Sequence, residues 1–271
     1  MPTVQSVAST AFASAQTVVI TKPTGVAVGD LLLAFIYHIE VSVTPPAGWS
    51  TLATDDDVTG KITSFYKIAT STEVAASNFT FDQGSTNEIA GGMLRIDGHS
   101  AGSPVWDSGF DDQTNGGTTP LLTMGVITSI ANSLLVGCIA CSAGTGVVSA
   151  FAVATSNPSW TEAFQHTTTD SVDFTFAVYY ATRPELTDTG DVSASFTGAA
   201  ASDWVGILAS FPPSKDFSKT ETMAMSDSKL GDITENDTET LALTEDVDAD
   251  LANPVSNVDK NLESWVNQDK S

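Results

Sequence analysis

The chain contains three histidines, His38, His99 and His166, the side chains best suited to acid-base catalysis near neutral pH. None of them lies in or beside a Gly-x-Ser-x-Gly or comparable nucleophile motif. A serine, a histidine and an aspartate could still meet in space, but serine and aspartate are so frequent here that this possibility predicts nothing. We therefore predict that the protein is not an enzyme and has no catalytic residues.

Acidic side chains gather in two segments that could offer oxygen ligands to Ca²⁺. The first is the run of aspartates at 55–57. The second lies near Asn115 and contains three aspartates: Asp107, Asp111 and Asp112. Neither segment has EF-hand spacing or a regular Gly-Asp repeat. We expect both to be solvated acidic loops, and we predict no metal ion and no cofactor.

Cys138 and Cys141 are the only cysteines, and they sit in an apolar run typical of a buried strand. Residues three positions apart on a strand point to opposite faces, so the two thiols are poorly placed for a disulfide or a shared metal. We predict two isolated, buried, small hydrophobic side chains.

Four tryptophans in the region 1–213 could stack on sugars: Trp49, Trp106, Trp160 and Trp204. Trp49 and Trp160 follow proline-containing turns at corresponding places in the two halves of this region, which favours packing over the end of a core. Trp106 lies outside the repeated segments and is the better candidate for a surface or glycan contact.

The composition limits the remaining functions. The 271 residues include 10 Lys+Arg and 33 Asp+Glu, a net charge of −23, and too few cations to follow a track of phosphates, which excludes a nucleic-acid partner. The 36 Thr and 30 Ser favour strands, and a hydrophobic content of 41% predicts a globular chain. The N-terminus has no apolar signal region and the run at 31–37 is too short to span a bilayer, so we expect a soluble protein, made in a cytoplasm, without a membrane partner.

A weak internal repeat organises the region 1–213. The apolar run that starts at Leu31 recurs at Leu134, so the offset between the halves is 134 − 31 = 103 at this point. The turn before Trp49 recurs before Trp160, where the offset is 160 − 49 = 111. The offset grows between the repeated segments, which places the insertions in loops.

The repeated segments have the character of short strands. They are rich in β-branched and aromatic residues, they are bounded by Gly, Pro, Asn or Asp, and 79–81 and 174–176 alternate apolar with polar side chains. The last strand of each half aligns Met93 with Ile207, where the offset is 207 − 93 = 114. We predict an all-β fold, a jelly-roll-type two-sheet sandwich built from a duplicated half, over residues 1–213.

The composition changes after Pro212 and Pro213, which cannot donate to a strand ladder. Residues 214–271 form an acidic arm with 5 Lys and 14 Asp+Glu, a net charge of −9. The similar segments 220–227 and 238–245 predict short strands, and a helix is predicted to begin at Asn253. We expect the arm to dock or oligomerise through six apolar side chains: Met223, Met225, Leu241, Leu243, Leu262 and Trp265.

Three segments of the first half carry a resemblance to a known family: Gly-Asp-Leu-Leu-Leu-Ala-Phe at 29–35, Pro-Pro-Ala-Gly-Trp at 45–49 and Phe-Tyr-Lys-Ile-Ala at 65–69. The sequence resembles a domain common in the structural proteins of tailed bacteriophages, and the resemblance covers about residues 1–213. The chain departs from the family at 157–160, where the second half more often keeps Ala-Gly before Trp. The resemblance implies a β-sandwich in a virion and brings no catalytic residues.

We therefore expect a non-enzymatic decoration or cement protein that stabilises the outer surface of a phage capsid. Its expected partners are the major capsid protein and further copies of itself, in a homotrimer, after assembly in the host cytoplasm. The alternative is a tail or fibre component whose sandwich binds host-surface glycan, with Trp106 as the contact. A glycan-cleaving enzyme is the least favoured hypothesis, because it needs two carboxylates ~5–10 Å apart in a cleft, which a sequence does not show.

Overall fold

The computed structural model describes residues 1–56, 60–100, 102, 105, 107–113, 131–142, 147–153, 158–168, 174–183, 192–197 and 203–214. The chain divides into two units, Met1–Lys219 and Thr220–Ser271, and every described residue belongs to the first. The predicted arm strands, the predicted arm helix and the six apolar arm residues lie outside the described residues, as does Trp106. The boundary that we predicted after residue 213 stays a prediction.

The first half of the sandwich forms one antiparallel sheet of five strands in the order β1-β5-β2-β4-β3. The strands are β1 (Thr3–Thr21), β2 (Leu31–His38), β3 (Ser50–Asp56), β4 (Lys61–Ile68) and β5 (Asn78–Asp97). A five-residue helix, α1 (Ser71–Ala75), precedes β5 and begins with a capping box between Thr70 and Glu73.

The second half forms another antiparallel sheet in the order β6-β12-β7-β10-β9, with a separate pair of strands, β8 and β11. The strands are β6 (Asp107–Gln113), β7 (Ser133–Ser142), β8 (Val147–Val153), β9 (Thr161–Thr167), β10 (Phe174–Arg183), β11 (Val192–Thr197) and β12 (Asp203–Phe211). The order repeats that of the first sheet strand for strand. The predicted all-β, two-sheet sandwich is confirmed, and the topology specifies that each sheet is drawn from one half of the chain.

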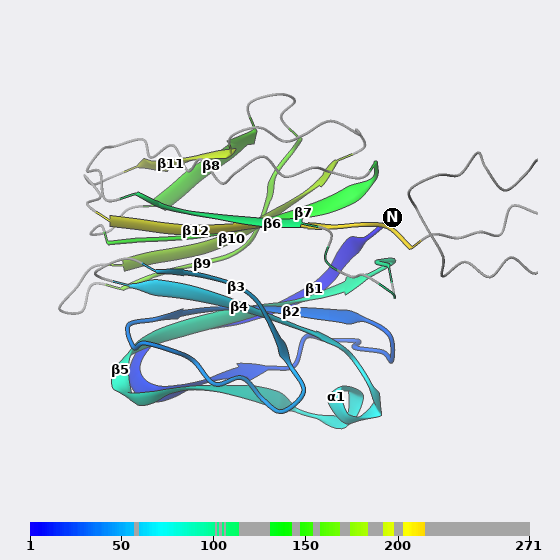
Figure 1. Ribbon diagram of the computed structural model, residues 1–271, viewed down its shortest axis with the longest axis horizontal. Helices are drawn as coiled ribbons and strands as arrows, with labels where there is room; N and C mark the ends of the chain where they lie inside the picture. The colour runs from blue at the N-terminus through cyan, green and yellow to red at the C-terminus, as the bar shows by residue number, and fades with distance from the viewer. Residues whose placement is uncertain are drawn as a thin grey trace, which may run out of the picture. The chain divides into compact units, whose positions relative to one another are not determined.

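The two sheets lie face to face, with β8 and β11 over the second sheet and the far ends of β1 and β5 beneath the first (Figure 1). Every residue of β2 is buried, because alternate side chains enter two different cores. Leu33 and Phe35 join an inter-sheet core with residues such as Val136 and Phe176 of the second sheet. Burial on both faces explains why β2 is a continuous apolar run rather than an alternating one.

A second core covers the outer face of the first sheet. The last part of β1, 17–21, pairs with the first part of β5, 78–82, and this paired stretch curves beneath the sheet. Ile20 and Phe81 therefore pack beside Leu32 of β2. Trp49 lies in this core, with its ring edge-on to Phe79 and Phe81 at centroid distances of 5.4 and 5.6 Å. The predicted packing role of Trp49 is confirmed, while Trp160 is half-buried.

The two halves are arranged so that their equivalent strands make equivalent contacts. Strand β1 lies against β9, and β3 lies against β6, which are the same pair of strands with the halves exchanged. Two copies of one unit that meet through the same surface form an isologous, two-fold contact. The sandwich therefore has the arrangement of a two-fold dimer whose halves share one chain.

The hydrogen-bond register refines the alignment of the two halves. In the first sheet Leu31 pairs with Ile96, whereas its counterpart Leu134 pairs with Phe211 in the second. The offset between the last strands is therefore 211 − 96 = 115, one more than predicted. A shift of one residue exchanges the two faces of a strand, so the difference changes which side chains correspond.

The predicted match of Met93 with Ile207 is wrong, and Gly92 takes its place. Met93 belongs to the outer core and Ile207 to the inter-sheet core, so their side chains point in opposite senses. The prediction matched two apolar runs by hydrophobicity, and a glycine at an inward position carries no hydrophobic signal.

Gly92 makes room for an aromatic ring of the other half. A Cβ at Gly92 would lie 2.1 Å from Cζ of Phe164 on β9, so the ring occupies the space of a side chain. The counterpart of Phe164 in β3 is Ala53, and Ile207 replaces Gly92 in the second half; both contribute to the inter-sheet core. In the contact between β5 and β9 the large side chain is Phe164 on β9, whereas in the equivalent contact between β12 and β3 it is Ile207 on β12. Each contact thus combines one large and one small residue, which keeps both contacts filled.

We expect Gly92→Ala to destabilise the fold by about 1–3 kcal/mol, because the added methyl group overlaps the Phe164 ring. The double variant Gly92→Ala/Phe164→Leu should cost less than the sum of the two single changes, since the smaller side chain leaves space for the methyl group. Urea unfolding of the four proteins measures this. Gly102→Ala, where a Cβ would meet open space, is the control; additive costs would contradict the contact.

Candidate functional site

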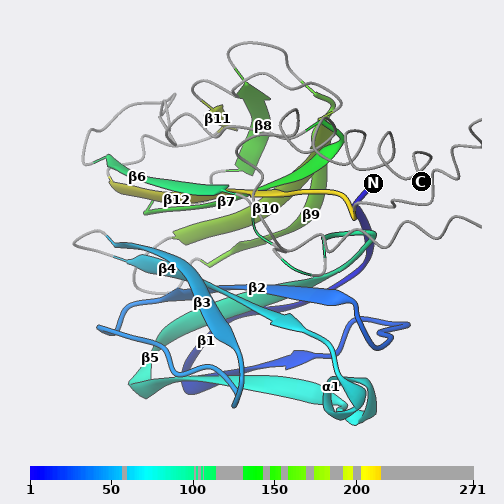
Figure 2. The same cartoon turned by 45° about the vertical axis from the view of Figure 1, so that its right-hand side comes forward.

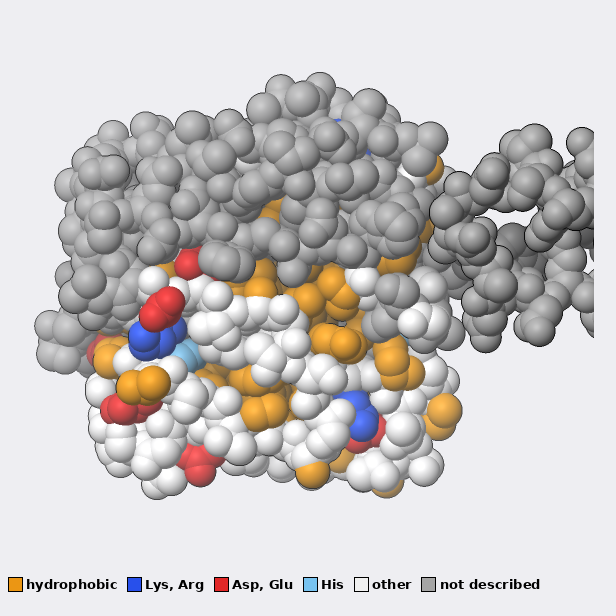
Figure 3. Space-filling model, in the orientation of Figure 1, with side chains coloured by type: hydrophobic (Ala, Val, Ile, Leu, Met, Phe, Trp, Pro, Cys, Tyr) orange, Lys and Arg blue, Asp and Glu red, His pale blue; other side chains and the backbone are white. Residues whose placement is uncertain are grey.

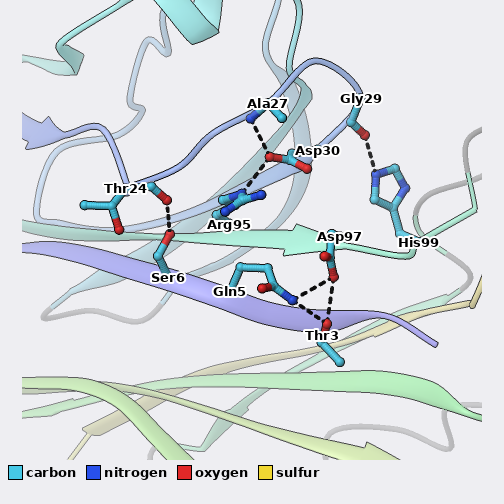
Figure 4. A network of polar contacts seen from close by, with 10 residues as sticks. All are labelled: Thr3, Gln5, Ser6, Thr24, Ala27, Gly29, Asp30, Arg95, Asp97 and His99. Carbon is cyan, nitrogen blue, oxygen red and sulfur yellow. Dashed lines mark hydrogen bonds and ion pairs between the residues drawn. The ribbon is translucent and has the colours of Figure 1, made fainter.

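A network of polar contacts links the starts of β1 and β2 to the end of β5 (Figure 4). It combines an ion pair, a histidine and several hydroxyl and backbone groups. The members are Thr3, Gln5, Ser6, Thr24, Ala27, Gly29, Asp30, Arg95, Asp97 and His99. Because it brings a carboxylate, a guanidinium and an imidazole close together, this network is the candidate site within the described part of the chain.

Asp30 and Arg95 form the centre of the network. Nε of Arg95 donates to Oδ2 of Asp30 at 2.6 Å, and the two side chains, Arg95 and Asp30, are 19% and 9% exposed. The same carboxylate oxygen accepts the backbone N–H of Ala27 at 2.6 Å. A Cβ at Gly25 would lie 2.7 Å from Nη1 of Arg95, so the turn at 24–30 closes over the guanidinium. The pair therefore fastens this turn to β5 and leaves little of either charge for a ligand.

The Gly-Asp pair at 29–30 shapes the entry into β2. Gly29 has φ +94°, a left-handed conformation that glycine adopts without strain. Its N–H donates to the carbonyl of Ala69 at 2.8 Å, and the N–H of Ala69 donates to the carbonyl of Asp30 at 2.8 Å. The counterpart of Gly29 in the second half is Asn132, which also has a positive φ of 61°. The repeated feature is thus a backbone turn.

His99 joins this network to the last strand of the sandwich. Its Nε2 faces the carbonyl of Gly29 at 2.9 Å and its Nδ1 faces the carbonyl of Ser100 at 3.0 Å. His99 also forms a β-bridge with Pro213, and the N–H of Ser100 donates to the carbonyl of Pro212 at 3.0 Å. This buried ring is occupied in holding together the ends of β5 and β12.

His38 has a hydroxyl partner, but the pair is enclosed. Nδ1 donates to the carbonyl of Glu40 at 2.8 Å, which leaves Nε2 as the acceptor for the Thr63 hydroxyl at 2.9 Å. Both side chains are buried, and burial lowers the pKa of His38 to about 4. A neutral imidazole that no substrate reaches is a structural hydrogen-bonding group, as expected for a histidine at a strand end.

The prediction of a solvated loop at 55–57 is wrong for Asp55 and Asp56, which belong to β3. Asp55 is buried and accepts the backbone N–H of Gly206, in the opposite sheet, at 2.5 Å. Asp56 is exposed and pairs with Lys61 at 3.0 Å. Successive strand residues point to opposite faces, so these two carboxylates cannot converge on one ion.

The second acidic segment is also a strand rather than a loop, because Asp107, Asp111 and Asp112 belong to β6. Asp57 and Asn115 lie outside the described residues. Within the described ranges no group of three or more His, Cys, Asp or Glu side chains could hold a metal ion.

The cysteine prediction is confirmed. Cys138 and Cys141 are both buried and free, and only Cys138 enters the inter-sheet core. Burial raises the pKa of both thiols, with the Asp55 charge as a further cause for Cys138, and the pKa of Cys141 reaches about 12. Neither thiol has the thiolate character that reactivity requires.

Equivalent positions in the two halves show which residues the sheet requires and which belong only to the ion pair. At equivalent positions the halves keep the positive φ of the turn and a glycine at 91 and 206. They do not keep the ion pair, because serines stand at 133 and 210 in place of Asp30 and Arg95. The duplication has therefore preserved the requirements of the sheet and not a chemical site.

Comparison of the chain with protein-family models, with curated proteins and with solved structures gave no match. Among the described residues, no helix is long and apolar enough to cross a membrane. Sequence reasoning considered His99 only as a candidate for catalysis and did not connect it with Asp30 and Arg95. The signal for Arg95 was available, since it is a lone cation within an apolar strand, a pattern that predicts a buried ion pair.

We expect Asp30→Asn to cost about 2–4 kcal/mol of stability, because it leaves the Arg95 charge partly buried without its counter-ion. The double variant Asp30→Asn/Arg95→Met should cost less than the sum of the single changes. Urea unfolding gives both values. The control is Lys61→Met, which removes the exposed pair with Asp56 and should cost less than about 1 kcal/mol; an equal cost in both pairs would contradict the role of Asp30.

The neutral, buried His38 predicts an acid-sensitive fold. The unfolded chain takes up a proton near pH 6.5 and the folded chain only near pH 4, so the stabilisation is complete above pH 6.5 and lost as the pH falls. The loss should approach about 3 kcal/mol by pH 4, and His38→Gln should remove this dependence. Free energies of unfolding between pH 7 and 4 test it. Parallel pH curves for the two proteins would rule out this contribution.

Proposed function

We propose that this chain is a non-enzymatic structural protein of a bacteriophage particle, a decoration or cement protein on the outer capsid surface. The observation that supports the proposal is that the buried histidines and aspartates form hydrogen bonds within the fold. His38, His99, Asp30 and Asp55 each make their hydrogen bonds to the chain's own backbone or side chains within the sandwich. The sequence resemblance to phage structural proteins supports the same conclusion.

The surface is suited to a protein present in many copies. On the described part of the face in Figure 3, groups of apolar side chains lie among white atoms of backbone and uncharged polar side chains, and acidic and basic groups are few. The chain as a whole has a net charge of −23. A net negative, hydroxyl-rich surface resists nonspecific association and keeps particles dispersed.

In this proposal the acidic arm joins the protein to its neighbours. The arm alternates apolar with polar residues in two segments, and such segments gain stability only when another surface covers their apolar side. The partners are the major capsid protein and the other subunits of a homotrimer. The contact residues are Met223, Met225, Leu241, Leu243, Leu262 and Trp265.

Copy number tests the position in the particle. Quantitative mass spectrometry of purified particles that carry this chain should find it in proportion to the major capsid protein. A few copies per particle would overturn the decoration role and favour a tail or fibre component that binds glycan. Absence from purified particles would overturn the virion role altogether.

The role of the arm is tested by Leu241→Asp/Leu243→Asp in the full chain. We expect loss of self-association and of capsid binding, because two charges would have to be buried against the partner. The control Thr238→Asp/Thr240→Asp adds the same charge to the polar side of the same segment. Sedimentation velocity and co-sedimentation with capsids measure both properties; equal binding by the two variants would contradict the arm contacts.

A further inference from the structure

The sheet edges of the sandwich differ in charge. The two large sheets end in β1 and β3, and in β6 and β9. Strands β3, β6 and β9 all carry carboxylates, for example Asp56 in β3 and Glu162 in β9. Strand β1 has 19 residues and contains no charged residue and no proline. Acidic side chains on an edge strand discourage pairing with a further strand, so β1 is the edge without this protection.

The first part of β1 is regular enough to accept a strand. Pairing with β5 is continuous from Ser6 to Thr10, between one shift in register at Val4/Ser6 and another at Thr10/Ala13. No side chain from Thr3 to Thr17 is fully buried. In the described part of the chain β1 pairs only with β5, so the backbone groups on its other side face away from the sheet.

The described chain ends beside the start of this edge. The N–H of Ser214 donates to the carbonyl of Gly98 at 2.8 Å. A Cβ at Gly98 would lie 2.6 Å from the carbonyl oxygen of Met1, so Ser214 and Met1 flank the same residue. The end of β12 and the N-terminus are adjacent in both ribbon views (Figures 1 and 2). The last described residue, Ser214, therefore lies next to the start of β1.

The arm carries a segment that fits this edge. Residues 238–245, Thr-Glu-Thr-Leu-Ala-Leu-Thr-Glu, place Leu241 and Leu243 on one side of an expected strand, and the eight residues match the length of Thr3–Thr10. Like charges opposite each other destabilise a strand pair, so an acidic segment is disfavoured at the carboxylate-bearing edges and not at β1.

Reach selects the segment. The stretch 215–237 can span about 80 Å, enough to reach another molecule, whereas the stretch 215–219, which precedes the similar segment 220–227, spans less than about 20 Å. A linker of about 80 Å lets residues 238–245 pair antiparallel with β1, as the other strands of this sheet pair with their neighbours. The proposed role of the arm in joining subunits selects the β1 of a second copy.

We propose that the edge of β1 at Thr3–Thr10 binds residues 238–245 of the arm of a second copy, as an added antiparallel strand. This inference rests on the proposed role of the arm in joining subunits. It names the surface that the arm binds, so that each sandwich is linked to the arm of a neighbouring subunit.

Cross-linking between two singly labelled full-length chains tests the pairing. One chain carries Ser9→Cys on β1, and the other carries Glu239→Cys, the position opposite Ser9 when Thr3–Thr10 pairs antiparallel with 238–245. Mixing and mild oxidation should give a disulfide-linked heterodimer as a main product, whereas replacing Ser9→Cys by Thr51→Cys, an exposed position on β3, should not. The native cysteines do not compete, because both are buried.

Three outcomes would overturn the inference. Equal cross-linking through Ser9→Cys and Thr51→Cys would show collision rather than pairing. A disulfide formed only within a single chain that carries both Ser9→Cys and Glu239→Cys would show that the arm binds its own sandwich. No disulfide in the mixture, nor in parallel mixtures with Thr240→Cys or Leu241→Cys, which cover shifts of one and two residues in register, would show that the arm does not reach β1.

A proline variant separates this inference from the proposed function. Ala242→Pro removes an N–H from the middle of the arm strand and should abolish self-association, whereas Gly231→Pro, outside both segments, should not. If Ala242→Pro dissociates the protein but the cross-link to β1 is absent, the β1 surface is wrong and the joining role of the arm stands. If the cross-link forms but particles hold only a few copies, the decoration role fails and the β1 surface stands.

Discussion

The fold depends on the face-to-face burial of two sheets that come from the two halves of the chain. The inter-sheet core draws residues from β2, β4 and β5 on one side and from β7, β9, β10 and β12 on the other, and neither sheet could cover this face alone. Because the halves meet through equivalent strands, some core contacts have a counterpart with the halves exchanged. Gly92 against Phe164, with Ala53 and Ile207 at the equivalent places, shows how the close packing tolerates divergence when the volumes change together.

The buried polar groups serve this packing. The carboxylate of Asp55 in one sheet accepts an N–H of the other, the Asp30–Arg95 pair closes a turn over the end of β5, and His38 remains neutral between a carbonyl and a hydroxyl. Each of these groups would cost several kcal/mol if it were buried without its partner. These polar groups are therefore engaged in the fold.

Much of the architecture could be predicted from the sequence, because it depends on local patterns. Short β-branched and aromatic segments indicated the strands, and their repetition indicated two equivalent halves, which the identical strand orders confirm. The spacing of Cys138 and Cys141 was enough to exclude a disulfide between them. The site was less predictable: Asp55 and Asp56 were expected in a loop, and the network around Asp30, Arg95 and His99 was missed, since its members are far apart in the sequence.

By itself, then, the sequence determined the all-β class, the duplication and the change of composition after residue 213, since these follow from periodicity and from the types of residue present. Only the tertiary structure decided which face each strand buries, because a shift of one residue reverses the faces and hydrophobicity alone does not detect it. Only the tertiary structure decided, too, that β1 is an edge and that Ser214 lies beside its start. Strand order depends on pairing between segments far apart in the chain, and no local pattern records it.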